Sequence, residues 1–211
     1  MQEIENLRYY LHDNFLTSEQ FKILTQEDAY MENKTCELKL GTGLKESGSI
    51  LLSYDNPIFN PKYGELLVKL RLTSKDDVVA YWGFKQNLTE PTETMIESHA
   101  GFLLINGKLY ATTGNGSNQQ KVQIQGLDLT KFYEYKIVYN KFYLAPLPEV
   151  LTYLGTPIIK KVPYEFRLLQ TNSTYPPKDQ VHYLVFFIKN TTATEKLLYL
   201  TKLIYKEKYP T

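Results

Sequence analysis

Several short stretches of the chain alternate apolar and polar residues with a period of two. Over residues 65–73, leucine and valine at the even positions alternate with mostly polar residues, and 133–139 and 197–206 repeat this pattern. A period of two places one set of side chains on each face of a half-buried β-strand. Turn residues separate such stretches about every 8–15 positions, which is typical of a sandwich or barrel. The predicted strands are 36–40, 49–54, 65–73, 78–84, 100–105, 108–113, 121–125, 133–139, 158–160, 165–169, 181–188 and 197–206.

One pair of these strands carries a specific turn signal. Asn106-Gly107 lies between two apolar stretches, 100–105 and 108–113. Asparagine and glycine both tolerate positive φ, which a two-residue type I′ turn requires at its two central positions. The sequence therefore predicts a β-hairpin with a type I′ turn here.

The N-terminal segment has a different periodicity. Ile4, Leu7, Leu11 and Phe15 recur at helical spacing, and Thr17 followed by Gln20 resembles a capping box. Residues 3–13 are therefore predicted to be a short helix or an arm. Docking of this arm on a neighbouring subunit, which would make an oligomer, and folding back on its own sandwich are equally consistent with its apolar residues.

Prolines mark the one linker-like stretch, 144–157, which contains Pro146, Pro148 and Pro157 and which we predict to be a crossover loop. No internal repeat is visible. The predicted organisation is an N-terminal arm over 1–30 and one β-sandwich domain over 31–211.

Charge and composition exclude several classes of partner. Twenty-four basic and twenty-three acidic side chains give a formal net charge of +1, so no global field attracts nucleic acid or anionic lipid. The longest apolar runs are strand-sized, so we expect no membrane insertion. The single cysteine cannot form an internal disulfide, and three histidines without metal-ligand spacing make zinc improbable. The expected partners are therefore protein subunits or glycans.

Glycosylation signals point to an outward-facing protein. Five Asn-x-Ser/Thr sequons occur among twelve asparagines, where chance would give about one or two. The acidic N-terminus followed by no apolar run predicts that no signal peptide is present and that synthesis is cytoplasmic. A virion or cell-surface protein reconciles the two observations, whereas the alternative is that strand-and-loop proteins are simply rich in these residues. The predicted acceptors are Asn33, Asn87, Asn115, Asn172 and Asn190.

Taken in order, these stretches resemble a known superfamily. The strands at 36–40 and 49–53 precede a Tyr-Gly-x6-Arg strand over 63–71, and 81–84, 100–102, 126–130, 133–137, 183–190 and 197–205 continue the pattern. This order resembles concanavalin A-like lectin/glucanase jelly rolls, including laminin-G-like relatives, and covers about residues 35–206. The resemblance implies an all-β fold of two stacked antiparallel sheets, whose concave sheet forms a groove that many relatives use for sugar chains.

The resemblance also specifies what a catalytic relative would contain. Retaining glucanases of this superfamily carry Glu-x-Asp-x-Glu on a groove strand. Here Glu93 and Glu97 have that spacing, but Met95 occupies the aspartate position. The two glutamates would start roughly 13 Å apart along a strand, so we expect them to lie in a polar loop before Ala100. His99 is expected to be a hydrogen-bonded surface residue rather than an acid–base partner.

Saccharide binding on the concave face would use aromatic stacking together with fixed polar groups. Trp82, Tyr81, Tyr110 and Arg71 could supply them, although strand alternation sends Trp82 and Tyr81 to opposite faces and a lone tryptophan is more often a core residue. A legume-type calcium cluster is not reproduced by the scattered aspartates, whereas one loop calcium, as in laminin-G-like relatives, stays open. Metal is therefore unassigned. The scattered aspartates are Asp55, Asp76, Asp77 and Asp128.

The function that these observations favour is a non-catalytic binding or assembly module. It is expected to be a surface-exposed or virion structural protein that is glycosylated and contacts glycans. Two alternatives stay open: a carbohydrate-binding lectin module, and a diverged glycoside hydrolase or polysaccharide lyase that uses Glu93 and Glu97.

Overall fold

The described part of the chain consists of strands and the turns between them. The computed structural model describes residues 7–13, 21–34, 37–146, 149–153, 156–160 and 165–208, with side chains over 21–33, 37–146 and 165–207. No helix of the length and hydropathy that a membrane crossing needs occurs in these ranges. The strands are β1 (Leu7–Asp13), β2 (Phe21–Gln26), β3 (Tyr30–Lys34), β4 (Glu37–Gly41), β5 (Ser49–Tyr54), β6 (Gly64–Leu72), β7 (Val78–Lys85), β8 (His99–Ile105), β9 (Lys108–Gly114), β10 (Gln119–Ile124), β11 (Tyr133–Val138), β12 (Lys141–Pro146), β13 (Glu149–Tyr153), β14 (Thr156–Lys160), β15 (Arg167–Thr171), β16 (Tyr183–Asn190) and β17 (Leu197–Lys208).

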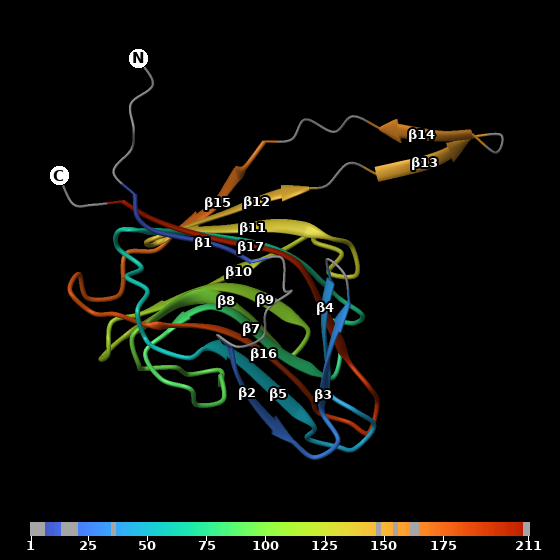
Figure 1. The fold of residues 1–211 in the computed structure, drawn as a ribbon, viewed down its shortest axis with the longest axis horizontal. Coiled ribbons are helices and arrows are strands. Elements are labelled where there is room, and N and C mark those ends of the chain that lie inside the picture. Colours follow the sequence, from blue (N-terminus) through green and yellow to red (C-terminus); the bar gives the residue numbers. More distant parts are fainter. Residues whose placement is uncertain are drawn as a thin grey trace.

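Two antiparallel sheets lie face to face and form a sandwich (Figure 1). The eight-stranded sheet has the order β15-β12-β11-β6-β17-β4-β3, with β1 also paired to β17. The seven-stranded sheet has the order β10-β9-β8-β7-β16-β5-β2. Strands β13 and β14 pair only with each other and extend away from the two layers. The predicted all-β, two-sheet antiparallel sandwich is confirmed.

Of the two forms predicted for residues 3–13, a short helix or an arm, the helix is wrong where the structure describes this segment. Leu7–Asp13 is strand β1, which pairs with the second half of β17. Strand β4 covers only the first part of β17, Leu197 to Leu200, so the rest of that edge is open to a further strand. Pairing with this edge overrides the helical spacing of the apolar residues. Residues 1–6 and the capping-box segment lie outside the described residues.

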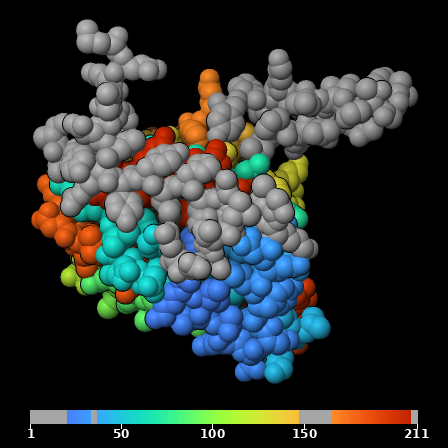
Figure 2. All heavy atoms as spheres, viewed as in Figure 1, coloured from blue at the N-terminus to red at the C-terminus, as the bar shows by residue number. Residues whose placement is uncertain are grey.

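Two strands that sequence reasoning missed connect the layers. Strand β2 pairs with β5 in the seven-stranded sheet, and β3 pairs with β4 in the eight-stranded sheet. The short turn between them therefore crosses from one layer to the other and closes one side of the sandwich. The atoms of this segment, in blue, form the lower part of the face in Figure 2.

The crossover loop predicted over 144–157 is also wrong, because strands β12, β13 and the start of β14 occupy most of it. Pro146 ends β12, and Pro157 lies opposite Thr152 in the two-stranded ribbon. Proline is tolerated at strand ends and in edge strands, where no ladder donor is lost. The prolines therefore mark strand ends and an edge rather than an irregular loop.

The hairpin between β8 and β9 is confirmed with its predicted turn. Asn106 has φ 51° and Gly107 has φ 70°. Two consecutive positive values define the type I′ geometry, whose twist matches that of the flanking strands. This turn brings the Asn106 side chain to the end of the sandwich.

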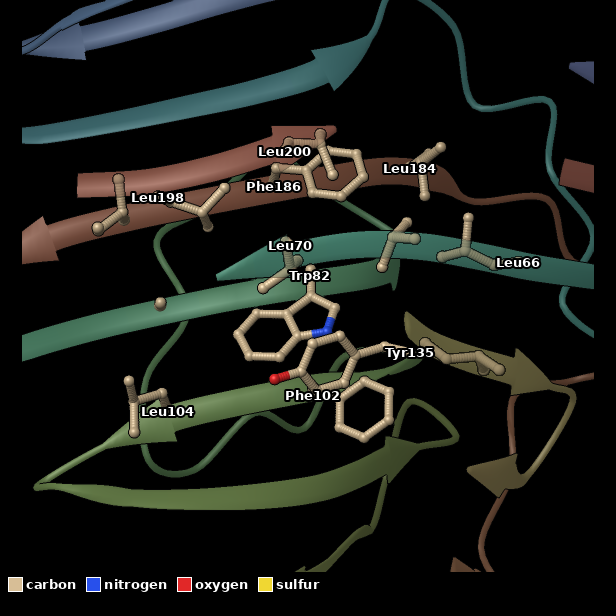
Figure 3. Close-up of a cluster of buried hydrophobic side chains, with 14 of the residues drawn as sticks. Leu66, Leu70, Trp82, Phe102, Leu104, Tyr135, Leu184, Phe186, Leu198 and Leu200 are labelled. Carbon is tan, nitrogen blue, oxygen red and sulfur yellow. The ribbon is translucent and has the colours of Figure 1, made fainter. Parts of the chain in front are cut away.

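Aromatic rings fill the centre of the space between the sheets (Figure 3). The Trp82 ring from β7 stacks on Phe102 from β8 with centroids 5.6 Å apart, and both rings contact Tyr135 from β11. Phe142 from β12 packs against Phe102 at 5.2 Å. Because these rings come from both sheets, their burial fixes the two layers against each other. Trp82 is fully buried and is therefore a core residue rather than a ligand-binding one.

Replacing Trp82 with alanine should destabilise the protein strongly. The change removes a fully buried indole and leaves a cavity, which we expect to lower the free energy of unfolding by about 3–5 kcal/mol. Trp82→Phe should cost less than half as much, because the indole Nε1 has no hydrogen-bond partner among the described residues. Urea unfolding followed by circular dichroism measures both. Equal losses for the two variants would contradict this packing.

Candidate functional site

The outer face of the seven-stranded sheet is covered by the loop that joins β7 to β8, residues 86–98. Met95 of this loop is buried against Tyr81, Leu103 and Phe187, which point outward from the sheet. These residues form a second apolar cluster, separate from the one between the sheets. The loop therefore fills part of this outer sheet face.

Tyr81 shows how closely the loop is packed. Its side chain is fully buried, and its hydroxyl donates to the carbonyl oxygen of Phe84 at 2.7 Å. A Cβ at Gly101 would lie 2.4 Å from the Tyr81 hydroxyl oxygen, so a residue with no side chain is needed there. Burial raises the pKa of Tyr81 well above its usual value, so its hydroxyl stays protonated. Tyr81 is thus a packing residue beneath the loop.

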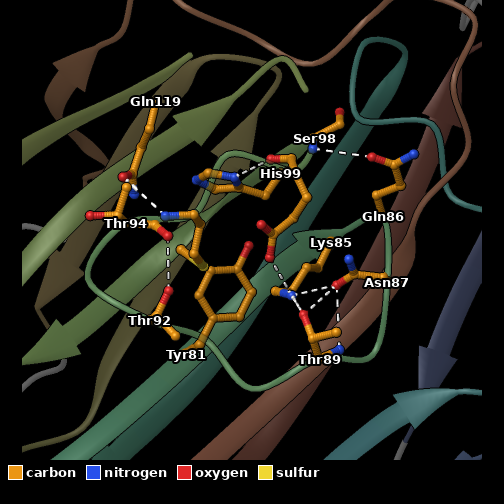
Figure 4. Close-up of polar contacts among 12 residues, drawn as sticks. Tyr81, Lys85, Gln86, Asn87, Thr89, Thr92, Thr94, Ser98, His99 and Gln119 are labelled. Carbon is orange, nitrogen blue, oxygen red and sulfur yellow. Dashed lines mark hydrogen bonds and ion pairs between the residues drawn. The ribbon is translucent and has the colours of Figure 1, made fainter. Parts of the chain in front are cut away.

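Lys85 at the end of β7 holds the loop in place (Figure 4). Its Nζ lies 2.6 Å from Glu97 Oε1, and it donates to Asn87 Oδ1 at 2.6 Å and to Thr89 Oγ1 at 2.7 Å. These three acceptors match the three protons of the ammonium group. Burial lowers the pKa of Lys85, and the Glu97 carboxylate opposes this effect. The buried cation therefore ties the two ends of the loop together.

His99 connects the loop to strands β9 and β10. Its Nδ1 donates to the carbonyl oxygen of Glu97 at 2.7 Å, and its Nε2 accepts from the Thr112 hydroxyl at 2.9 Å. Gln119 donates to the same hydroxyl at 3.0 Å and accepts from the amide of Met95 at 3.1 Å. These bonds fix one tautomer of a neutral ring. The prediction that His99 is a surface residue is wrong, because the loop buries it completely.

A second buried histidine repeats this arrangement. His182 Nδ1 donates to the Gln180 carbonyl oxygen at 3.0 Å, and its Nε2 lies 2.7 Å from the Ser98 hydroxyl. Burial lowers the pKa of His182 and of His99 to about 4 each. Both rings are therefore neutral at pH 7. Because Ser98 and His182 are fully buried, the pair is structural in this conformation.

Glu93 and Glu97 lie in the loop between Pro91 and β8, as predicted, and each is held by a different cation. Glu93 is exposed and pairs with Lys121 of β10 at 3.0 Å, whereas Glu97 pairs with Lys85 of β7. Strands β10 and β7 are three positions apart in the sheet, roughly 14 Å. Glycosidase carboxylates lie about 5–10 Å apart. The strands that anchor the two glutamates are thus farther apart than the two carboxylates of a glycosidase pair.

The lowered pKa of Glu97 is also unsuited to a general acid. Burial acts to raise its pKa, but the hydrogen bond from Lys85, a backbone hydrogen bond and the neighbouring positive charges outweigh this effect and lower it. A general acid needs a raised pKa to carry a proton at neutral pH. Glu97 is instead an ionised partner of the buried lysine.

The four predicted ligand-binding residues do not lie together. Trp82 is between the sheets and Tyr81 is beneath the loop. Tyr110 is partly exposed on β9, next to the edge strand β10, and Lys121 Nζ is 4.7 Å from its ring centroid. Arg71 is on β6 of the opposite sheet. No single groove contains all four.

An open cleft lies at one end of the sandwich. A cavity of about 510 Å³ is lined by 73–76 and 126–130, and an adjoining cavity of about 230 Å³ is lined by 76–79, 106–107 and Thr191. Asp76 lines both cavities. We refer to the two together as the end cleft. In an antiparallel sandwich the β6–β7, β8–β9 and β10–β11 connections all lie at the same end, which is why distant turn residues meet here.

The side chains of the end cleft are mostly hydrogen-bonding groups. Asp76, Ser74, Asn106 and Thr130 provide carboxylate, hydroxyl and amide groups. The carboxylate of Asp128 accepts from the Thr130 hydroxyl at 2.6 Å, and this bond and one from the Thr130 amide lower the pKa of Asp128. Sequence reasoning noted the aspartates only as scattered. The order of the antiparallel strands would have shown that the turns carrying Asp76 and Asp128 lie at the same end of the sandwich.

Calcium is not assigned to a site in this region. Within the described ranges, no group of three or more histidine, cysteine, aspartate or glutamate side chains could hold a metal ion. Calcium sites usually combine several carboxylate and carbonyl oxygens. The loop calcium stays unassigned.

Burial separates the five predicted glycosylation sites into two groups. Asn172 and Asn190 are fully buried, and their side-chain amides donate to Thr113 Oγ1 at 2.9 Å and to the Lys45 carbonyl oxygen at 2.9 Å. A glycan on either nitrogen would have no room in the folded chain, so these two predictions are wrong for the folded protein. Asn33, Asn87 and Asn115 are at least partly exposed and stay predicted acceptors.

Comparisons with known proteins identify structural neighbours but no sequence relative. No family model and no curated protein matches the chain. The VIP36 exoplasmic/lumenal domain in its Ca2+-bound form superposes with a TM-score of 0.62 at 10% identity, over 98% of this chain and 93% of that one. The Emp46p carbohydrate recognition domain gives 0.56 at 9% identity, over 94% and 93%. A structure from work on endo-acting O-glycanases of the human gut microbiota gives 0.55 at 12% identity, over 97% and 100%.

Glu97→Gln should destabilise the protein far more than Glu93→Gln. The first change leaves the fully buried Lys85 cation without its carboxylate, and we expect a loss of roughly 3 kcal/mol in the free energy of unfolding. Glu93 is a matched control because its side chain is 56% exposed, so its loss should cost less than about 1 kcal/mol. Urea unfolding of both variants measures the difference. Similar losses would refute the anchoring role of Lys85.

Stability should fall as the pH is lowered below about 6.5. The folded-state pKa of His99 and His182, about 4, lies below the 6.5 of an exposed histidine, so the unfolded chain binds more protons between these values. The loss should reach roughly 2 kcal/mol per histidine at pH 5, with no change above about pH 7. Unfolding midpoints across this range test it, and His99→Gln should flatten the profile. A flat profile for the unmodified chain would contradict the assignment.

Proposed function

Because the chain has the concanavalin A-like jelly-roll fold, we propose that it is a non-catalytic carbohydrate-binding module. The observation that carries this proposal is the end cleft, where loops from successive antiparallel connections gather carboxylate, hydroxyl and amide groups around an open cavity. The sheet face next to it is filled by the β7–β8 loop. The ligand therefore binds at the end of the sandwich rather than along the sheet.

The chemistry of the end cleft suits a neutral saccharide. Sugar hydroxyls donate to carboxylates such as Asp76 and accept from amides such as Asn106. Both residues are exposed, and Leu127 offers a partly exposed apolar surface to the carbon face of a sugar ring. The positive φ at Asn106 comes from a rigid type I′ turn, so the amide is presented with little loss of conformational freedom on binding.

Two structural neighbours support this ligand class. VIP36 has also been described in a Ca2+/Man3GlcNAc-bound form, and the Emp46p domain is named a carbohydrate recognition domain. The O-glycanase neighbour raises hydrolysis as an alternative. The ion pairs of Glu93 and Glu97 favour binding without turnover, because the contact with Lys85 helps to lower the pKa of Glu97 and because the two glutamates are anchored to different strands.

An outward-facing location accords with this function. The three exposed sequons, at Asn33, Asn87 and Asn115, suit a protein displayed on a virion or cell surface. VIP36 is described as an exoplasmic/lumenal domain, which agrees with such a location. In this role the module would attach its particle or cell to glycans.

A glycan array probed with the full chain tests the function. We expect binding to a neutral glycan at micromolar affinity and at least tenfold weaker binding for Asp76→Asn, because the variant loses a charged acceptor without changing shape. Asn106→Gly keeps the turn and removes the amide, and it should weaken binding as well. No binding to any glycan, or release of sugar from a polysaccharide panel, would refute the proposal.

Two further experiments test where on the protein the ligand binds. Tyr110→Ala changes the open part of the sheet face and should leave binding within about twofold, since it does not line the end cleft. Chelation with EDTA should have no effect, because the described carboxylates do not form a metal site. Loss of binding in Tyr110→Ala alone would move the ligand to the sheet.

A further inference from the structure

Positive charge gathers on the outer face of the eight-stranded sheet. On β6, β11, β12 and β17, residues that alternate with core residues point away from the sandwich. These outward positions carry six cations and two anions, although the whole chain has a net charge of only +1. The cations are Lys69, Arg71, Lys136, Lys141, Lys202 and Lys206, and the anions are Glu65 and Glu134.

Three of these cations form no ion pair with a carboxylate in the part of the chain that the structure describes. Glu134 is buried and pairs with Lys202 at 3.0 Å. Among the described residues, no carboxylate lies within ion-pair distance of Lys69, Arg71 or Lys136. Their charges are therefore available to an anion from outside the chain.

Aromatic rings hold these three cations in position. The Arg71 guanidinium lies 4.1 Å from the Tyr199 ring centroid and 5.1 Å from that of Phe132. Lys136 Nζ lies 5.0 Å from the Tyr143 centroid and 4.3 Å from that of Phe166. A cation–π contact engages the charge but uses none of the N–H donors. The donors are thus presented on ordered side chains, which reduces the entropy cost of binding.

The three cations follow one line across the sheet. Lys69 and Arg71 are two residues apart on β6, so their backbone positions are about 7 Å apart. Lys136 is on the neighbouring strand β11, where it lies opposite Leu67 of β6. Successive steps along Arg71, Lys69 and Lys136 are therefore of similar length. Such a row matches a polymer that carries negative groups at intervals rather than a single small anion.

We propose that this face binds an acidic polysaccharide, a glycan chain with carboxylate or sulfate groups, through Arg71, Lys69 and Lys136. Arginine binds planar or tetrahedral oxyanions with two parallel hydrogen bonds, and lysine adds point charges. The site is on the opposite sheet from the β7–β8 loop. It goes beyond the proposed function and does not depend on the end cleft.

The observations favour a polysaccharide over a nucleic acid. Single-stranded nucleic acids bind through bases stacked on aromatic rings. Here the rings of Tyr199, Phe132, Tyr143 and Phe166 already have cations over them, so they are not free for bases. Nucleic-acid-binding domains are also usually strongly basic overall, unlike this chain.

The test measures binding of the full chain to immobilised heparin, which is sulfated, and to polygalacturonate, which is carboxylated. Dextran is the neutral control and single-stranded poly(U) is the nucleic-acid control. We expect binding to at least one acidic polysaccharide and none to dextran, with weaker binding as NaCl rises from about 50 to about 200 mM. The Lys69→Gln/Arg71→Gln double variant should bind about tenfold or more weakly.

A matched double variant separates this site from general charge effects. Lys121→Gln/Lys189→Gln removes the same charge from the seven-stranded sheet, where both lysines are ion-paired, and should bind within about twofold of the unmodified chain. Arg71→Lys keeps the positive charge, so it should keep most of the binding to the acidic polysaccharide. This variant still tests the site if the glutamine double variant does not fold. Equal losses in the two double variants, equal binding to dextran, or tighter binding to poly(U) would overturn the proposal.

The same variants distinguish this proposal from the end cleft. Asp76→Asn should not weaken heparin or polygalacturonate binding, and Lys69→Gln/Arg71→Gln should not weaken binding to a neutral glycan. If the chain fails to bind neutral glycans, the test with acidic polysaccharides can still be interpreted, and the reverse also holds.

Discussion

The contact between the two sheets is the constraint on which the rest of the structure depends. Trp82 and Phe102 from the seven-stranded sheet meet Tyr135 and Phe142 from the eight-stranded sheet, and their rings pack edge to face or stacked. Once these rings are buried, period-two alternation decides the direction of every other side chain on the same strands. It sends Tyr81 and Lys85 to one outer surface and Lys136 to the other.

The two outer surfaces then take different roles. On the seven-stranded sheet the β7–β8 loop adds a second apolar cluster and a buried ion pair, so the chain itself occupies part of this outer surface. The buried pair between Lys85 and Glu97 is stable because three acceptors satisfy the ammonium group. Because the contact with Lys85 helps to lower the pKa of Glu97, this carboxylate is unsuited to act as a proton donor at neutral pH.

Charge is also distributed unevenly over the surface, which the net charge of the chain does not show. Although the net charge is only +1, one sheet face is basic, and the end cleft contains Asp76, Asp77 and Asp128. A near-neutral chain can thus present one surface for hydroxyl-rich ligands and another for anions. Composition alone excludes a long-range field, but it does not exclude local charge patterns, because these depend on which strands become neighbours.

Local pattern in the sequence determined the fold class, most strands, the Asn106-Gly107 turn and the loop position of Glu93 and Glu97, because alternation and turn chemistry act over a few residues. Tertiary structure alone decided the rest. Leu7–Asp13 formed strand β1, not the helix that was one of its two predicted forms, because a free edge of β17 was available. Tyr81 became buried because the β7–β8 loop folds back over it. Asn172 and Asn190 lost access to glycans, and Asp76 and Asn106 gained a common cleft, since burial and proximity arise only when separate strands pack together.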